Sequence, residues 1–288
     1  MKFSEAFHVY RDLVLSSQTR REIMSELGRW EHHVSPVLAK HELEEIKNLQ
    51  ILQLRKTLEN KKLSPQSIYH CLSLVRRVLR RAEEWELYPG PVPRFSMPKF
   101  DNRRLRFLTP LEVGMLLKKL EERSGLWRDV AAFALYTGLR AGEIYRLRAF
   151  AVDSANAHVK IYDSKNSLNR IVPLNPRALA IILKYKHTSR PELPLFQEQG
   201  RLPEQSYHVF RKAVHDCGFN TGITDRRERV CFHSLRHTFA SWLVQSGTPL
   251  ALVSRLLGHK DIKMTMRYAH VAPDQGKAAV AILAKIRL

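Results

Sequence analysis

The sequence has few of the features that would place a chain outside the cell or in a membrane. It contains only 3 cysteines, Cys71, Cys217 and Cys231, and no CxxC pair, which is typical of reduced thiols in a cytoplasmic protein. Its longest apolar runs, such as 130–135, are far shorter than the roughly 18 residues that span a bilayer. The N-terminus lacks the apolar stretch of a signal peptide. We therefore expect a cytoplasmic protein without membrane contact.

Acidic residues are scarce in relation to basic ones. Lys and Arg number 48 against 28 Asp and Glu, which gives a net charge of +20. A charge this far from zero is costly in self-repulsion and usually reflects a polyanionic partner, the alternative being a basic but merely solvated surface. Residues 1–97 carry 16 basic against 12 acidic side chains, and the remainder carries 32 against 16. Most of the attraction for an anion should therefore arise in the C-terminal part.

The length of 288 residues leaves room for two ordinary domains. Apolar residues recur at helical spacing through residues 1–97, which predicts a helical N-terminal domain. Its last helix starts at Ser64, with Pro65 in the first helical position. That helix is expected to expose a basic stripe of Arg76, Arg77, Arg80 and Arg81. The stripe is either a solvated face or a surface that lies along a nucleic-acid backbone.

A basic, proline-containing segment follows and predicts a linker over residues 98–107. Prolines 89, 91, 93 and 98 break the helical pattern, and the linker carries Lys99, Arg103, Arg104 and Arg106. An extended basic chain of this kind can cross a phosphate backbone while it joins two domains.

The second domain is predicted over residues 108–288 and begins with a helix-capping pattern, Thr109-Pro110-Leu111-Glu112. A further helix ends at Thr137-Gly138, and alternating residues in 159–162 and 170–174 predict an antiparallel hairpin with its tip at 164–169. Helices are expected over 176–186, 204–216, 234–245, 249–257, 261–269 and 274–286. The predicted fold is therefore mainly α, with one small antiparallel sheet.

Candidate chemistry gathers near the C-terminus, where His233, Arg236, His237 and Tyr268 fall close together in the sequence. His233 and Arg236 are three apart and share a helix face, about 100° round from the expected apolar stripe. His233 and His237 have a spacing that can hold zinc, but Arg236 lies between them and no third ligand has matching spacing. A basic pair beside a phenol is instead suited to attack on a phosphate. Taken singly, each of these residues is uninformative.

Taken jointly, the residues resemble those of the tyrosine recombinases, also called phage-type integrases. Five elements occur in that family's order and approximate spacing: 137–144 (TGLRAGEI), the Lys165 hairpin running into 172–174, 233–240 (HSLRHTFA), 256–259 (LLGH) and Tyr268. They span about 105 to 275, and residues 1–97 look like the family's helical core-binding domain. Because the chain begins almost directly with those helices, we expect a simple, Xer-like recombinase without an arm-binding domain.

The resemblance implies that DNA strands are broken and rejoined through a 3′-phosphotyrosyl intermediate, with neither ATP nor metal. Each motif residue then has an expected role. Tyr268 is the nucleophile, Lys165 protonates the leaving 5′ oxygen, and His233 assists proton transfer from Tyr268. Arg140 and Arg236 clamp the phosphate, His259 hydrogen-bonds a phosphate oxygen, and Glu143 orients the arginines. Arginine suits the clamp because its planar fork binds two oxygens at once.

The resemblance also implies partners. These are double-stranded DNA with short inverted core sites, three further copies of the chain in a synaptic tetramer, and accessory proteins. The amphipathic tail is expected to pack into a neighbouring protomer, or alternatively onto its own domain. The host system is a phage, a mobile element or a chromosome-resolution system. Two other functions stay open, a topoisomerase-like strand transferase and a non-catalytic architectural DNA-binding protein, although DNA binding alone does not require a phenol at position 268.

Overall fold

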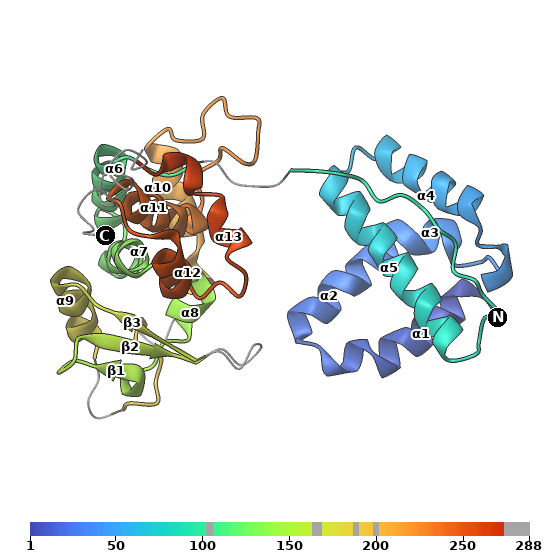
Figure 1. Ribbon diagram of the computed structural model, residues 1–288, viewed down its shortest axis with the longest axis horizontal. Coiled ribbons are helices and arrows are strands. Elements are labelled where there is room, and N and C mark those ends of the chain that lie inside the picture. The colour runs from blue at the N-terminus through green and yellow to red at the C-terminus, as the bar shows by residue number, and fades with distance from the viewer. Residues whose placement is uncertain (102–105, 163–168, 187–189, 198–201, 274–288) are drawn as a thin grey trace, which may run out of the picture. The chain divides into compact units, whose positions relative to one another are not determined.

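The computed structural model describes residues 1–101, 106–162, 169–186, 190–197 and 202–273. The chain divides into two compact units, residues 1–102 and 103–288, and each is described by itself (Figure 1). The described chain is mostly helical with one small antiparallel sheet, which confirms the predicted fold class. No helix among the described residues is both long and apolar enough to cross a membrane.

The N-terminal unit is a helical bundle packed around its longest helix, α5. Its helices are α1 (Phe3–Leu13), α2 (Arg20–Arg29), α3 (Ser35–Leu38), α4 (Asn48–Asn60) and α5 (Pro65–Glu84), with short turns at Leu15–Ser17 and Leu43–Glu45. The side chain of Ser64 caps α5 by accepting a hydrogen bond from the Ser67 amide, as the sequence predicts. A π-helical turn, Trp30–Val34, joins α2 to α3, and its Trp30 ring stacks on Phe7 at 3.9 Å between centroids.

The segment after α5 packs back onto the N-terminal unit. Val92, Phe95 and Met97 are partly buried against its core. The guanidinium of Arg76 lies over the Phe95 ring, 4.6 Å from its centroid, and donates a hydrogen bond to the Phe95 carbonyl at 2.9 Å. Arg76 is therefore half-buried, and the prediction that it belongs to an exposed stripe is wrong, because the returning segment covers that side of α5.

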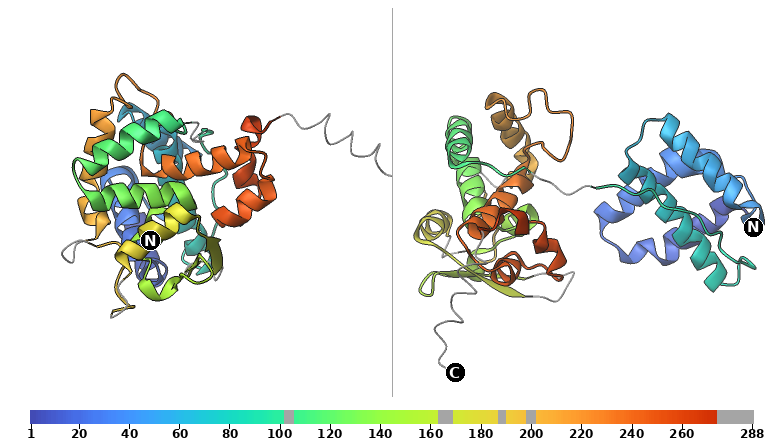
Figure 2. Two further views of the ribbon diagram at one scale, coloured as in Figure 1. Left: turned by 90° about the vertical axis from the view of Figure 1, so that its left-hand side faces the viewer. Right: turned by 45° about the horizontal axis from the view of Figure 1, so that its top comes forward.

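The C-terminal unit contains eight α-helices in its described residues, with a three-stranded sheet. Its elements are α6 (Pro110–Glu121), α7 (Gly125–Thr137), α8 (Ala141–Tyr145), β1 (Val152–Asp153), β2 (His158–Ile161), β3 (Arg170–Pro173), α9 (Pro176–Tyr185), α10 (His208–Asp216), α11 (Phe232–Gln245), α12 (Leu250–Leu257) and α13 (Lys263–Met266), with 3₁₀ turns at Ala149–Ala151, Pro203–Ser206 and Ala269–Val271. Helix α11 packs against α7 on one side and α12 on the other (Figures 1 and 2).

The sheet has the order β1-β2-β3, with both pairs antiparallel. Val159 pairs with Val172, and both side chains are buried, whereas Ile171 on the opposite face is 60% exposed. The predicted hairpin is therefore present as β2 and β3, and its alternation of inward and outward residues follows from the two-residue period of a strand. Strand β1 was not predicted, because two residues are too short to show alternation.

Two predicted helices are shorter than expected. The one predicted over 204–216 is divided into a 3₁₀ turn that starts at Pro203 and α10, which starts at His208. The one predicted over 261–269 is limited to α13, because the Tyr268 amide bonds back to the Thr265 carbonyl, three residues earlier instead of four. The tail helix predicted over 274–286 lies outside the described residues.

Candidate active site

Helix α11 buries polar as well as apolar side chains, and its polar groups hold other segments in place. The Thr238 hydroxyl accepts a hydrogen bond from the Leu108 amide at 2.9 Å and donates to the Ser234 carbonyl at 2.8 Å. The Trp242 indole donates to the Leu108 carbonyl at 3.1 Å. Both backbone groups of Leu108 are thereby bound to α11, which fixes the start of the C-terminal unit against the helix.

Arg236 lies at the centre of the site and is only 3% exposed. Its Nη1 donates to the Gly138 carbonyl and its Nη2 to the Leu257 carbonyl, each at 2.7 Å, so that it joins the ends of α7 and α12. Gly138 has a left-handed backbone (φ 65°), and a Cβ there would overlap the Phe239 ring. Burial, followed by repulsion from Arg140, lowers the pKa of Arg236 to about 9, so that the guanidinium is still charged at neutral pH.

Glu143 is the acidic partner of two arginines beside Arg236. Its Oε1 accepts from Arg140 Nη1 and Arg170 Nη1, both at 3.0 Å, and its Oε2 accepts from the Arg140 amide and Arg170 Nη2, both at 2.8 Å. The side chain of Glu143 is 9% exposed and that of Arg140 is 38% exposed. Burial alone would raise the pKa of Glu143, but the hydrogen bonds from Arg170 hold it below its ordinary value. The predicted orienting role of Glu143 is compatible with this geometry.

Arg170 is a member of the arginine cluster that sequence reasoning missed. It is the first residue of β3, its side chain is 12% exposed, and it forms a bidentate pair with Glu143. It also packs against Gly258, where a Cβ would lie 2.8 Å from Arg170 Cδ, Cζ and Nε. Gly258 ends α12 with a left-handed backbone (φ 66°). Only its place directly after the hairpin tip distinguishes Arg170 in the sequence, so nothing local indicated this role.

His259 follows Gly258 and faces the same cluster. Its Nδ1 lies 2.7 Å from the hydroxyl of Thr265, which is fully buried on α13. Burial, followed by repulsion from Arg236 and Arg140, lowers the pKa of His259 to about 4. His259 is therefore neutral at pH 7. If the Thr265 hydroxyl donates to Nδ1, the proton is on Nε2, where it is available for donation to an oxygen.

Tyr268 is held inside the unit by a histidine on α11. The residue is 5% exposed, and its hydroxyl lies 2.5 Å from Nδ1 of His237, itself 3% exposed. Burial raises the pKa of Tyr268, while Arg267 and Arg236 act in the opposite direction. His233 is exposed on the first turn of α11, and its ring meets that of His237 edge-to-face at 4.7 Å between centroids. His237, one helical turn farther along than His233, therefore lies within hydrogen-bond distance of Tyr268. The help with proton transfer that we expect from His233 stays a prediction.

Several predicted residues cannot be compared with the site. Lys165, Arg103 and Arg104 lie outside the described residues. Three other arginines predicted to bind DNA bond to side chains of the protein itself. Arg77 donates hydrogen bonds to Tyr10 and Glu26. Arg81 forms an ion pair with Glu84, and Arg106 forms one with Glu112. Arg80 and Lys99 are exposed. Among the described residues, no three His, Cys, Asp or Glu side chains come together as metal ligands would.

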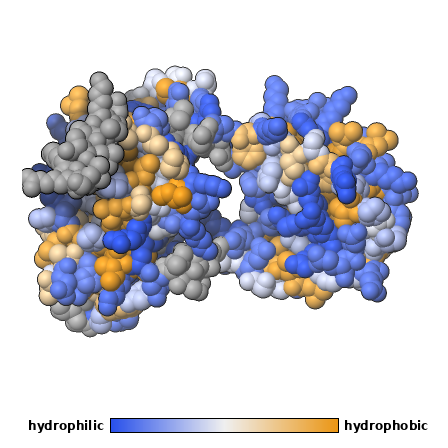
Figure 3. Space-filling view, viewed as in Figure 1, coloured by the Kyte–Doolittle hydropathy of each residue, from blue (hydrophilic) through white to orange (hydrophobic). Residues whose placement is uncertain are grey.

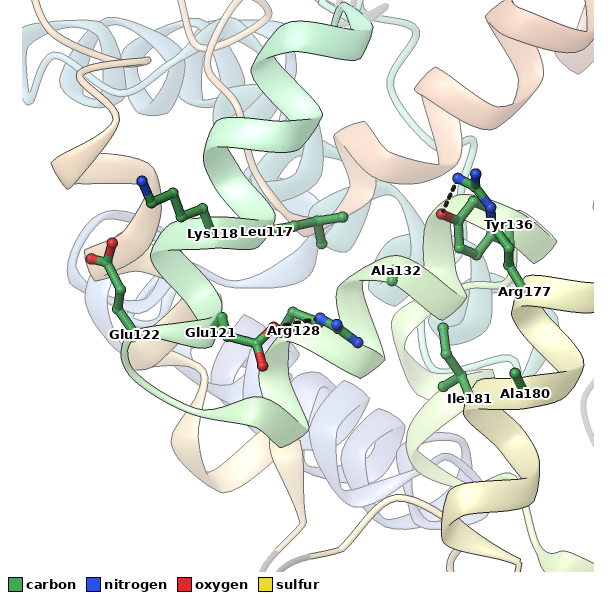
Figure 4. A pocket seen from close by; sticks show the side chains of 10 residues that line it. All are labelled: Leu117, Lys118, Glu121, Glu122, Arg128, Ala132, Tyr136, Arg177, Ala180 and Ile181. Atoms are coloured by element: carbon green, nitrogen blue, oxygen red, sulfur yellow. Dashed lines mark hydrogen bonds and ion pairs between the residues drawn. The ribbon is translucent and has the colours of Figure 1, made fainter.

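A cavity of about 780 Å³ in the C-terminal unit shares no lining residue with this site. It is an open groove between α6, α7 and α9, lined by Leu117, Ala132, Ala180 and Ile181 together with charged residues at its rim (Figure 4). Its one phenol, Tyr136, accepts a hydrogen bond from Arg177 at 3.4 Å. The other cations of the groove, Lys118 and Arg128, lie apart from that phenol (Figure 4), so the groove does not gather several cations around one nucleophile as the site above does.

Comparison with known proteins agrees with the resemblance drawn from the sequence. Residues 106–275 match the model of the phage integrase family, which is more than half of the chain. The chain belongs to the phage integrase family. The matched region includes every described residue of the arginine cluster, together with His259 and Tyr268.

Other integrases and recombinases are similar over most of the chain. An integrase of Salmonella phage P22 is 32% identical over 214 residues, which are 70% of this chain and 53% of that protein. A tyrosine recombinase of Pseudothermotoga lettingae is 32% identical over 245 residues, 82% of each chain. The aligned region is therefore about half the length of the phage protein but most of the bacterial one.

Solved integrase structures share the fold of this chain. A crystal structure of a lambda integrase (75–356) dimer bound to a core site matches with a TM-score of 0.75, at 17% identity, over 96% of this chain and 97% of the other. At that identity, the similarity shows only that the two chains share a fold.

Proposed function

We propose that the protein is a site-specific DNA recombinase that cleaves and rejoins duplex DNA through Tyr268. The observation that carries the proposal is the convergence of a buried tyrosine, a buried arginine and two further arginines in a chain of the integrase family. Relatives that are named integrases and tyrosine recombinases support the same activity.

The arginine cluster is suited to a phosphodiester. Arg140, Arg170 and Arg236 act on one another electrostatically, and Glu143 is the carboxylate that pairs with two of them. Three guanidinium groups against one carboxylate leave an excess of positive charge in a partly buried site. Such charge stabilises the additional negative charge that a phosphodiester acquires in a pentavalent transition state. Arg140 is the most exposed of the three and would meet the phosphate first.

Tyr268 supplies the nucleophile in this proposal. Its oxygen attacks the scissile phosphorus, a 3′-phosphotyrosyl bond forms, and the 5′ oxygen departs with a proton, for which Lys165 is the proposed donor. His259, neutral at pH 7, donates a hydrogen bond to a phosphate oxygen. The covalent step conserves the energy of the phosphodiester, so that rejoining to another strand needs neither ATP nor metal.

The N-terminal unit is proposed to bind the core site and the C-terminal unit to carry the chemistry, in a cytoplasmic assembly on short inverted sites. Of the residues predicted to bind DNA, Arg80 and Lys99 are exposed and would contact backbone phosphates, an interaction that is sensitive to salt.

A tetramer is proposed to form through residues 275–288 of each protomer. Three exposed apolar side chains between His259 and Tyr268, Ile262, Met264 and Met266, support this assembly. These side chains are 44%, 48% and 52% exposed, and apolar residues gather on this part of the unit (Figure 3). The tail is rich in Ala, Ile and Leu, and it would cover such a surface on a neighbour.

The test is covalent capture. Wild-type protein is incubated with genomic DNA of its host, denatured, and the attached strands are sequenced at the junction. A nicked duplex is then built on that junction, so that the cleaved strand diffuses away. Wild type should accumulate a 3′-linked adduct and Tyr268→Phe should form none, whereas equal adduct yields would refute Tyr268 as nucleophile. Tyr136→Phe, which removes the hydroxyl of another tyrosine in the same unit, is the matched control. Sedimentation of the same complexes gives the number of protomers.

A further inference from the structure

The hydroxyl of Tyr268 has a specific neighbour whose chemistry the mechanism above does not use. His237 Nδ1 lies 2.5 Å from Tyr268 Oη, and both side chains are almost completely buried. The phenol therefore cannot give its proton directly to bulk water. A group that accepts this proton must already lie within hydrogen-bond reach, and His237 occupies that position.

A second histidine extends from His237 toward solvent. His233 is one turn earlier on α11, its ring and that of His237 meet edge-to-face at 4.7 Å between centroids, and its side chain is exposed. The three residues thus form a continuous series from the buried phenol through a buried imidazole to an exposed one. His259 lies outside this series, because its Nδ1 is turned to Thr265.

We propose that His237 is the proton acceptor for Tyr268 and passes the proton on to His233. The inference rests on the proposed function, because it requires Tyr268 to be the nucleophile. As the phosphorus–Oη bond forms, the Oη–H bond breaks and the proton moves to His237 Nδ1. His237 then releases its Nε2 proton to His233. The phosphorus–5′ oxygen bond breaks separately, and the leaving oxygen takes its proton from another group. Rejoining reverses each transfer.

The surroundings favour a relay over a lasting positive charge on His237. The charged and titratable groups that act on the pair are Arg236 and His233 on α11 and Arg267 beside Tyr268. Two of these are arginines, which stabilise a phenolate but oppose an imidazolium. Transfer to the exposed His233 removes the proton from this cationic region. If His237 acted alone, it would have to keep the proton there.

The experiment separates activation of Tyr268 from protonation of the leaving group. The nicked junction duplex is made in two forms, one with the normal 5′ oxygen at the scissile phosphate and one with sulfur in its place. A thiolate leaves without a proton, because thiols are much stronger acids than alcohols. Loss of a leaving-group acid is therefore rescued by sulfur, whereas loss of the acceptor for the Tyr268 proton is not.

Single-turnover cleavage by His237→Asn should be slower by about 10²–10⁴-fold on both duplexes, the range for loss of a general base. Its rate should continue to rise with pH where that of wild type levels off, because hydroxide replaces the missing acceptor. His233→Gln, an exposed change that the fold tolerates, should slow both duplexes as well. His270→Asn changes an exposed histidine of the segment after Tyr268 and should cleave at the wild-type rate.

Each other outcome has a distinct meaning. Cleavage by His237→Asn within about threefold of wild type, with unchanged duplex binding, would overturn the inference. Rescue of either variant by sulfur would also overturn it, because the histidines would then serve the leaving group. If His237→Asn does not fold, the response of His233→Gln decides the relay. Absence of any adduct with wild-type protein would instead refute the proposed function itself.

Discussion

Replacing Glu143 with glutamine should reveal how strongly one carboxylate holds the arginine cluster together. The carboxylate accepts four hydrogen bonds, two at each oxygen, from Arg140 and Arg170. An amide retains one acceptor oxygen and presents an NH₂ group to two donors. The Arg140 interactions weigh less, because that side chain is 38% exposed and water replaces the carboxylate there.

The bidentate pair with Arg170 dominates the magnitude, since its side chains are 12% and 9% exposed. Breaking one partner of a buried pair costs about 3–5 kcal/mol. We expect the lower end, about 3 kcal/mol, because glutamine keeps the shape and one acceptor. For a unit of this size that corresponds to a fall in Tm of about 6–12 °C. The pKa of Glu143 is lowered in the folded state. The difference in stability between wild type and Glu143→Gln should therefore persist at every pH above the ordinary pKa of 4.5, and it should vanish as the pH falls through the pKa of the folded state.

Thermal unfolding of Glu143→Gln, wild type and Asp216→Asn measures the effect. Asp216 pairs with Arg123 at the surface of the same unit, where a salt bridge contributes about 0–1 kcal/mol. Added sulfate should restore Glu143→Gln more than it stabilises wild type, because the anion compensates the uncovered guanidinium groups. A loss no larger than that of Asp216→Asn, or no additional response to sulfate, would refute the view of Glu143 as the counter-ion of the cluster.

Two further changes test the packing around the site. Gly258→Ala should lower the free energy of unfolding by about 1–2 kcal/mol for a left-handed backbone and by about 1–3 kcal/mol more for displacing Arg170. Gly222 also has a left-handed backbone (φ 72°) but open space around it, so Gly222→Ala should show only the first loss. Urea unfolding measures both. Asp129 is buried and accepts hydrogen bonds from Lys184, Tyr185 and Arg128. Burial raises its pKa, but the three hydrogen bonds together lower it below the ordinary value of 3.8. Asp129→Asn should therefore be less stable than wild type at pH 7, with the difference in stability closing as the pH falls below 3.8. Equal costs for the two glycines, or a gap that does not vary with pH, would contradict these predictions.

The sequence predicted best what depends on neighbours in the chain. The capping pattern Thr109–Glu112 starts α6 where expected, and the stops at Gly138 and Gly258 end α7 and α12 with left-handed backbones. These features are local, because a cap or a turn needs only a few successive residues. The family was also correctly predicted, since the order of its motifs is visible in the chain.

What the sequence could not supply was the identity of non-local partners. Arg170 joins the cluster because β3 brings it to Glu143, 27 positions earlier, and to Gly258, which leaves room for it. His237 was considered only as a zinc ligand, because its spacing from His233 is visible whereas the end of α13, which directs Tyr268 toward it, is not. Arg76 was misjudged for the same reason, since its cover comes from Phe95.

Helix α11 has a consequence for anyone who wishes to redirect the enzyme to new DNA. Its side chains tie down Leu108, the ends of α7 and α12, and Tyr268 all at once. A library that varies this helix would lose folding and chemistry together and leave few survivors to select. Diversity is better introduced in the N-terminal unit, which we propose binds the core site, at exposed positions such as Arg80 that lie outside this framework. The architecture thus separates the part that must stay constant from the part that can evolve.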